Sequence, residues 1–186
     1  MNNPDTQARR RSRRQLIMIA AVFLAPIMIA AGVGLTGWMP GTRGNGESIE
    51  PQRSFLDVPL TLADGRRYAW RDPEEPRFTL LALPGQGCAA RCEEQLTMMY
   101  NARTTMNQNM QRVRLVYVGK PPTTAGALAP EWQIASDTDN ALSAFRPPGT
   151  DSLAAILVQS NGTALSLYRD GFNPTGLRKD MKKVVK

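Results

Sequence analysis

The sequence contains no histidine, and this absence removes much of ordinary enzyme chemistry. A serine or cysteine nucleophile is commonly activated by a histidine base, so the chain cannot form a Ser-His or a Cys-His pair. Two cysteines without histidine also cannot make the usual tetrahedral zinc site. Gly85 and Gly87 lack the further glycines and the lysine of a phosphate-binding loop. The sequence therefore argues against a hydrolase, a kinase or a zinc protein.

Acidic residues are almost missing from the first part of the chain, where only Asp5 accompanies the run Arg9–Arg14. The whole chain has 23 Lys+Arg against 16 Asp+Glu, a formal charge of +7. Because much of this excess lies in one N-terminal run, it does not indicate a basic surface on a folded domain. We expect no nucleic acid partner.

Charge is absent from Leu16 to Trp38, a run long enough to cross a hydrocarbon core of about 30 Å as a helix. The arginines before it and Trp38 at its end are typical of an anchor whose N-terminus is cytoplasmic. We therefore expect a basic cytoplasmic head at 1–15 and a single transmembrane anchor at 16–38 in a bacterial inner membrane. The remainder would lie in the periplasm.

A cleaved signal peptide is the alternative, since it also joins a basic region to an apolar one. The apolar run exceeds the usual length of about 7–15 residues, and Ile29–Ala31 makes a poor cleavage site. These features favour an uncleaved anchor. Residues 39–54, rich in Gly, Pro and polar side chains, are expected to form a tether, and 55–186 the folded domain.

Within 55–186 the patterns predict an α/β domain with a mixed central sheet flanked by helices. Strands are expected around the Asp64-Gly65 turn, in two buried apolar runs and in a late hairpin, and helices between and after them. The expected strands are 55–70 (two, around the turn), 78–84, 113–118 and 153–169 (a hairpin), and the expected helices are 89–112, 137–145 and 174–186. The runs 78–83 and 113–118 should be adjacent and parallel, joined through the long helix.

Cys88 and Cys92 follow the first buried strand and begin the long helix. Unpaired N–H groups and the helix dipole at that place favour a thiolate, and Arg91 adds positive charge. Sulfurs four residues apart at a helix start can also join as a disulfide in an oxidising compartment. A bridge over so short a loop stabilises a fold only modestly, by about 2 kcal/mol. Redox chemistry, metal binding and a structural disulfide all remain open.

The chain resembles the thioredoxin-like SCO/SenC proteins of cytochrome c oxidase assembly. The resemblance rests on the anchor, the tether, the Asp64-Gly65 hairpin, the apolar strand ending in C-x3-C, and Ile156–Gly162, which is similar to the family's "YLIDPxG" hairpin. It implies a thioredoxin-like fold for 55–186. It also implies an accessory role in oxidase assembly, with a respiratory oxidase subunit or assembly factor as partner.

The same resemblance implies copper held by two cysteines and a histidine, but this chain has no histidine. Asp151 or a neighbour stands where that ligand is expected, and a carboxylate suits Cu(I) poorly. Met98 and Met99 are weighed as substitutes, but methionines at helical spacing usually fill cores, so Met99, Met106 and Met110 are expected inside. We expect no cofactor, with copper on Cys88 and Cys92 as the minor alternative.

The sequence thus favours a membrane-anchored, periplasm-facing protein that acts by dithiol/disulfide exchange, with Cys88 and Cys92 as its catalytic residues. Cys88, nearer the glycine loop, should be the attacking sulfur. A non-catalytic binding module with a structural disulfide and a Cu(I) chaperone with an incomplete site are the alternatives. Pro147 and Pro148 are candidates, by position only, for the cis-proline that often faces the active loop of thioredoxin-like proteins, but the sequence favours a plain turn there.

Overall fold

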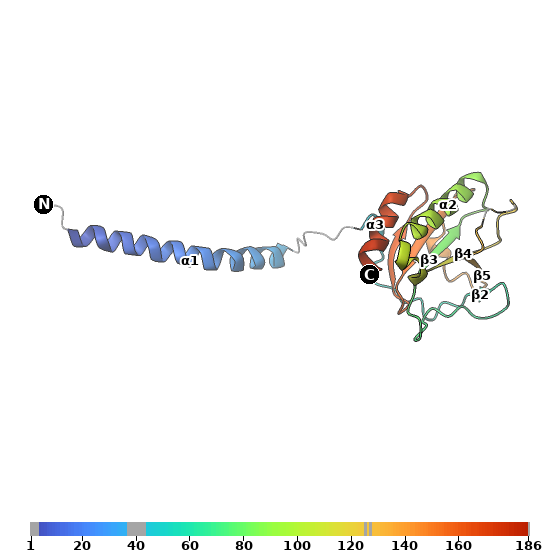
Figure 1. The fold of residues 1–186 in the computed structure, drawn as a ribbon, viewed down its shortest axis with the longest axis horizontal. Coiled ribbons are helices and arrows are strands. Elements are labelled where there is room, and N and C mark those ends of the chain that lie inside the picture. Colours follow the sequence, from blue (N-terminus) through green and yellow to red (C-terminus); the bar gives the residue numbers. More distant parts are fainter. Residues whose placement is uncertain (1–3, 37–43, 125, 127, 186) are drawn as a thin grey trace. The chain divides into compact units, whose positions relative to one another are not determined.

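The computed structural model describes residues 4–36, 44–124, 126 and 128–185. The chain divides into two compact units, 1–43 and 44–186, which are considered separately. In the first unit, α1 runs from Pro4 to Thr36 and contains Pro26 (Figure 1). The expected anchor at 16–38 lies within this helix except for positions 37 and 38, which fall outside the described residues. Among the described residues, no helix meets the length and apolarity required of a membrane span.

The second unit is built on one sheet with strand order β1-β7-β6-β3-β4-β5-β2. The strands are β1 Glu47–Ser48, β2 Thr61–Leu62, β3 Phe78–Pro84, β4 Val113–Val118, β5 Trp132–Ser136, β6 Leu153–Val158 and β7 Ala164–Tyr168. The helices are α2 Ala90–Thr104 and α3 Pro174–Val184, with short 3₁₀ turns η1 Asn107–Arg112 and η2 Ser143–Phe145. The predicted mixed sheet with flanking helices is confirmed.

The centre of the sheet is the strand-helix-strand unit that the sequence predicts. β3 and β4 are adjacent and parallel, with Phe78 opposite Val113, and α2 connects them. β6 lies antiparallel on the other side of β3, where Pro84 pairs with Leu153. This register brings the residues before β6 beside the residues after β3, at the carboxyl end of the central strand.

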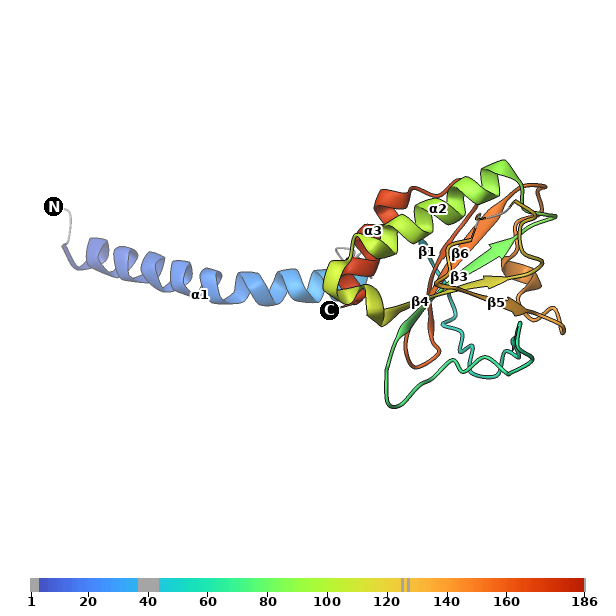
Figure 2. The ribbon, with the colours of Figure 1, turned by 45° about the vertical axis from the view of Figure 1, so that its right-hand side comes forward.

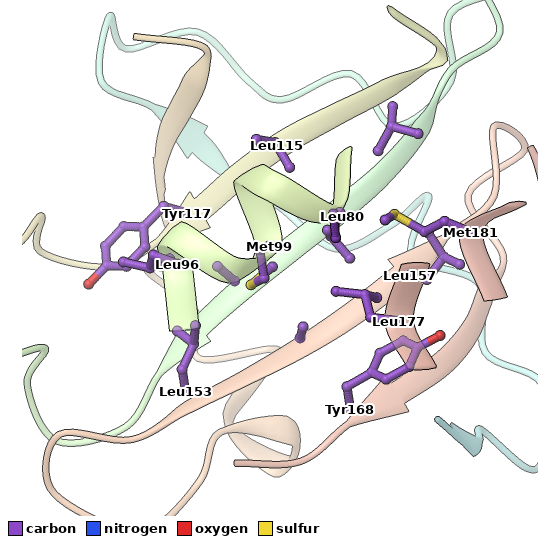
Figure 3. Close-up of a cluster of buried hydrophobic side chains, with 14 of the residues drawn as sticks. Leu80, Leu96, Met99, Leu115, Tyr117, Leu153, Leu157, Tyr168, Leu177 and Met181 are labelled. Carbon is purple, nitrogen blue, oxygen red and sulfur yellow. The ribbon is translucent and has the colours of Figure 1, made fainter. Parts of the chain in front are cut away.

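Both faces of the sheet are buried. Successive side chains along β3 point to opposite faces, and nearly all of them are buried. Leu80 packs in the cluster that includes Leu96 and Met99 of α2 and Leu177 of α3 (Figure 3). Leu81 packs in the opposite cluster, which the segment 55–70 covers. Figure 2 shows α2 and α3 side by side on the first face. The core assignment is confirmed for Met99 and Met106, which are buried, whereas Met110 is partly buried and packs against the same cluster.

The long helix expected at 89–112 ends earlier than the apolar pattern suggests. Thr104 and Thr105 bond through their hydroxyls to the carbonyls of Asn101 and Ala102, and Asn107 has φ 52°. A left-handed residue cannot continue an α-helix, so the chain proceeds as η1. The α-helix therefore ends at Thr104.

Three further elements differ from the sequence prediction. β5 follows the proline-rich segment 120–131, where the sequence predicts no strand, and it pairs with both β4 and β2. Only η2 is helical within the short helix expected at 137–145, because the Asp137 carboxylate accepts the N–H groups of Ala141 and Leu142 in a turn. The hairpin around Asp64-Gly65 reduces to β2 and a single bridge to Arg67.

The folded unit begins at Gly44, so the end of the segment expected as a tether lies on the sheet. Glu47 and Ser48 pair with β7. Just before them, the Asn45 N–H donates to the carboxylate of Asp180 at 2.5 Å, and the Asn45 side-chain amide donates to it at 3.0 Å. Asp180 is buried on α3, and this contact fastens the start of the unit to its last helix.

Candidate functional site

Cys88 and Cys92 form a disulfide at the junction of β3 and α2, with their Cα atoms 5.1 Å apart. Cys92 lies in the first turn of α2 and is 0% exposed within the core cluster. Cys88, in the loop before the helix, is only partly buried. The predicted junction is confirmed, and a reactant from solvent meets Cys88 before Cys92.

The cysteine loop rests on the loop that precedes β6. The Gly85 N–H donates to the Ser152 carbonyl at 2.9 Å and the Gln86 N–H to the Gly149 carbonyl at 3.1 Å. The Ser152 hydroxyl also donates to the Gly149 carbonyl, at 2.6 Å. A Cβ at position 85 would lie 2.5 Å from Ser152 Oγ, so glycine is required for this approach.

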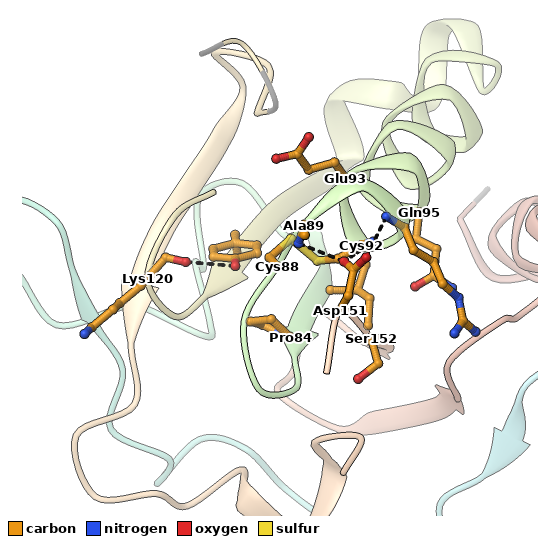
Figure 4. The surroundings of a disulfide bond; sticks show 12 residues. Pro84, Cys88, Ala89, Cys92, Glu93, Gln95, Lys120, Asp151 and Ser152 are labelled. Atoms are coloured by element: carbon orange, nitrogen blue, oxygen red, sulfur yellow. Dashed lines mark hydrogen bonds between the residues drawn. A yellow bond between two sulfur atoms is a disulfide. The ribbon is translucent and has the colours of Figure 1, made fainter. Parts of the chain in front are cut away.

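Asp151, in this second loop, caps α2. The N-cap residue Ala89 has no side chain able to satisfy the first N–H groups of the helix. Asp151 Oδ1 accepts from Ala89 N at 2.7 Å and from Cys92 N at 3.0 Å, while its Oδ2 accepts from Arg91 N at 3.0 Å. Figure 4 shows Asp151 next to the disulfide at this helix end.

The electrostatics of the Asp151 carboxylate follow from these bonds. The N–H of Cys92, followed by those of Arg91 and Ala89, lowers the pKa of Asp151 below its ordinary value against the opposing effect of desolvation. The carboxylate is therefore negatively charged at neutral pH. The backbone of Asp151 has φ 52°, a left-handed conformation that aspartate tolerates better than most residues.

Arg91, which the sequence suggests as positive charge for a thiolate, makes an ion pair instead. Its Nη2 lies 2.6 Å from Oδ2 of Asp170. Oδ1 of Asp170 accepts from Gln95 Nε2 at 3.2 Å and from Leu153 N at 3.1 Å. Asp170 therefore ties α2 to the start of β6, and the charge of Arg91 acts both on this partner and on Asp151.

Arg146 fastens the neighbouring strand ends. Its Nη1 donates to the Pro84 carbonyl at 2.9 Å and its Nη2 to the Val118 carbonyl at 3.0 Å. These carbonyls end β3 and β4, so one guanidinium fixes the edge from which the cysteine loop departs. Neither this role nor that of Asp170 is signalled by the sequence. The position of Asp151 beside the cysteines is anticipated, whereas its capping role is not.

Comparison with known proteins assigns the domain. A family described as transmembrane-like, thioredoxin-like, C-terminal domain matches residues 78–186, which covers the sheet from β3 onward, the disulfide and α3. The chain belongs to this family. No curated protein matches the sequence of this thioredoxin-like chain.

Two solved structures resemble the thioredoxin-like domain in fold. The bacterioferritin comigratory protein of Xanthomonas campestris, described for its alkyl peroxide reduction activity, is 13% identical with a TM-score of 0.50; the match covers 76% of this chain and 97% of that protein. Yeast Sco1 with copper bound is 12% identical with a TM-score of 0.51, covering 69% and 86% of the two chains. The resemblance to SCO/SenC proteins is thus confirmed at the level of fold.

The copper site that the SCO resemblance implies does not fit the residues of this thioredoxin-like domain. Both sulfurs are joined to each other, and the carboxylate of Asp151 already accepts three N–H groups. In the part of the chain that is described, no three His, Cys, Asp or Glu side chains form a group that could hold a metal. Cu(I) prefers thiolate, thioether and imidazole, and carboxylate oxygen is a hard ligand.

Pro147, Pro148 and Met98, the remaining residues singled out in the sequence, take no part in the chemistry of the disulfide. Pro147 and Pro148, weighed as cis-prolines against a plain turn, do not follow cis bonds, since within the described residues the cis peptide bond precedes Pro51. Pro147 instead directs its carbonyl at Gly85, as part of the tight loop contact. Met98 is partly buried and lines a groove between α2 and α3, away from the disulfide.

Proposed function

We propose that this chain is a thiol-disulfide exchange protein of the SCO type, whose catalytic residues are Cys88 and Cys92. The observation that carries the proposal is the disulfide itself. It joins a partly buried sulfur to a fully buried one at a strand-to-helix junction of a thioredoxin-like domain. In that arrangement the sulfur of Cys88 is accessible to a partner, and the buried sulfur of Cys92 can resolve the mixed disulfide.

In the proposed reaction, the Cys88 thiolate of the reduced pair attacks one sulfur of a partner disulfide. A Cys88-partner bond forms, the partner's S–S bond breaks, and the released partner thiolate takes up a proton. The Cys92 thiol then loses its proton, and its thiolate attacks Sγ of Cys88. The Cys88–Cys92 disulfide forms, the second partner thiol leaves, and two electrons have passed to the partner. The reverse sequence oxidises a partner dithiol.

The proposed setting is the periplasmic side of a bacterial inner membrane, with residues 1–15 as a cytoplasmic head, 16–38 as the anchor and 55–186 as the working domain. The proposed tether is 39–54, although its part from Gly44 onward belongs to the folded unit. The uncharged run of the sequence supports the anchor, as do large apolar side chains exposed along α1, such as Phe23 and Met28. The SCO-like fold supports an accessory role in cytochrome c oxidase assembly. The proposed partner is a cysteine pair of a respiratory oxidase subunit or assembly factor.

A permanent structural disulfide in a binding module is the second candidate, and the complete burial of Cys92 favours it. Redox titration of the full chain separates the two functions. A reduction potential above about −300 mV is expected for an exchanging pair, whereas a value below it is typical of a structural bridge. Transfer of the disulfide to a reduced partner peptide containing two cysteines, followed by mass spectrometry, tests the reaction directly.

A further inference from the structure

The helix N-terminus that would activate the cysteines is already occupied. The N–H groups of Ala89, Arg91 and Cys92 all point to the carboxylate of Asp151, which lies next to the disulfide (Figure 4). A helix start stabilises a thiolate only where such donors and the positive end of the dipole are free to act on the sulfur. Here they act on a carboxylate instead.

Other charged groups surround the site, and the charge of Arg91 helps to lower the pKa of Asp151. Some belong to α2 and others to the segments packed against its start. They are Arg91, Glu93 and Glu94 on α2, Asp170 after β7, Lys120 after β4 and Arg146 after η2. The guanidinium of Arg91 is paired with Asp170, and that of Arg146 is held by two strand carbonyls. The charged group that is bonded directly to the N–H groups at the helix start is the carboxylate of Asp151.

We propose that Asp151 is a positioning residue that takes the N-terminus of α2 away from Cys88 and Cys92, and so keeps the reduced thiols protonated and slow to react at neutral pH. A carboxylate beside a thiolate opposes its formation by like-charge repulsion. The expectation from sequence, an acidified thiol, is thereby reversed.

This inference deepens the proposed function and rests on it. A reduced pair that ionises reluctantly reacts slowly with small disulfides met at random. Exchange would then depend on a docked partner that brings its sulfur directly to Cys88. A positively charged partner surface, which neutralises Asp151, would accelerate the reaction most.

The test is alkylation of the reduced full chain by iodoacetamide across pH, with the label on Cys88 followed by mass spectrometry. In Asp151→Asn, the amide oxygen can take the place of Oδ1 and accept from Ala89 N and Cys92 N, while the bond from Arg91 N and the charge are lost. The midpoint of the pH profile should fall by about one pH unit. The rate at neutral pH should rise about threefold, since intrinsic nucleophilicity falls as acidity rises.

Asp137→Asn is the matched control, because Asp137 also accepts two backbone N–H groups but in a turn before η2. Its profile should coincide with that of the unmodified chain. An unchanged or raised midpoint in Asp151→Asn would overturn the proposal and leave Asp151 a structural cap only. Should that variant not fold, the unmodified chain decides: a midpoint above the ordinary thiol value of about 8.5 supports the proposal and one below it refutes it. Alkylation needs no partner, so it remains informative even where disulfide exchange fails.

Discussion

The N–H of Gly85 donates to the carbonyl of Ser152 at 2.9 Å, and a Cβ at position 85 would meet the Ser152 hydroxyl oxygen at 2.5 Å. The cysteine loop and the loop before β6 therefore approach too closely for any side chain larger than hydrogen. The Pro147 carbonyl stands 2.6 Å from the same point, so the backbone would have to move.

Gly85→Ala should destabilise the domain by about 1–3 kcal/mol, the usual cost of overpacking. Thermal or urea unfolding of the two forms measures the difference. Gly149→Ala in the same loop is the control, because its added Cβ would lie 3.4 Å from Ser152 Oγ, an ordinary contact. Equal stability of the Gly85→Ala and Gly149→Ala variants would contradict this account of the loop packing.

The two cysteines should give different products when substituted singly. Cys92→Ser leaves the accessible Cys88 without its resolving thiol, so the mixed disulfide with a partner peptide should accumulate. Cys88→Ser should form no mixed disulfide, since Cys92 is fully buried. Non-reducing electrophoresis with mass spectrometry distinguishes them, and circular dichroism checks that both fold. A mixed disulfide formed by Cys88→Ser would show that Cys92, and not Cys88, is the attacking sulfur.

Asp180 should contribute to the free energy of unfolding of the domain and to the decrease of that free energy at acid pH. Burial opposes ionisation, yet hydrogen bonds from Asn45, Tyr168 and Gly46 outweigh it, so the pKa of Asp180 lies below its ordinary value. Such a group stabilises the fold above the unfolded value of about 3.9, and the contribution disappears as pH falls through the lower folded pKa. Asp180→Ala leaves these donors unpaired and should cost about 1–3 kcal/mol at neutral pH.

The variant should also lose part of the acid sensitivity, because its folded state no longer carries this carboxylate. Urea unfolding at pH 7 and at lower pH measures both effects. Asp139→Ala, at an exposed position, should change stability by less than about 0.5 kcal/mol. A stability of Asp180→Ala equal to that of Asp139→Ala would show that the contact between Asn45 and α3 is dispensable.

Alkaline pH should also weaken the domain. Burial raises the pKa of Tyr117 to about 12, against the opposing charge of Arg146. Burial, followed by the charge of Asp180, raises the pKa of Tyr168 as well. Because the unfolded tyrosines ionise near pH 10, the stability that these groups contribute is present below that pH and is lost as pH rises through the folded values.

The unfolding temperature should accordingly fall from about pH 10 upward, and unfolding should add the phenolate absorbance of Tyr117 and Tyr168. Tyr117→Phe removes one such group and its bond to the Lys120 carbonyl, so its decline should be shallower. An unfolding temperature that stays constant over this range would argue that the two phenols are not sequestered.

The central elements could be predicted because their sequences are apolar apart from Thr79 in β3 and Arg114 in β4. β3 and β4 are buried on both faces, and the run of aliphatic residues in each reflects this directly. β5 could not be found in the same way, since its burial varies from residue to residue and it follows a proline-rich loop. The position of the cysteines followed from strand and helix order alone. The capping of α2 by Asp151 could not be predicted in this way, because the pairing of Pro84 with Leu153 brings Asp151 to the helix start.

The two outermost strands of the sheet, β1 and β2, contain only two residues each. As far as the described residues define it, the sheet therefore presents very little free strand on either margin to which another chain could add by backbone pairing. Short margins of this kind discourage self-association of the domain by backbone pairing. They also mean that a partner is better recognised through side chains and the loops around Cys88 than by extending the sheet.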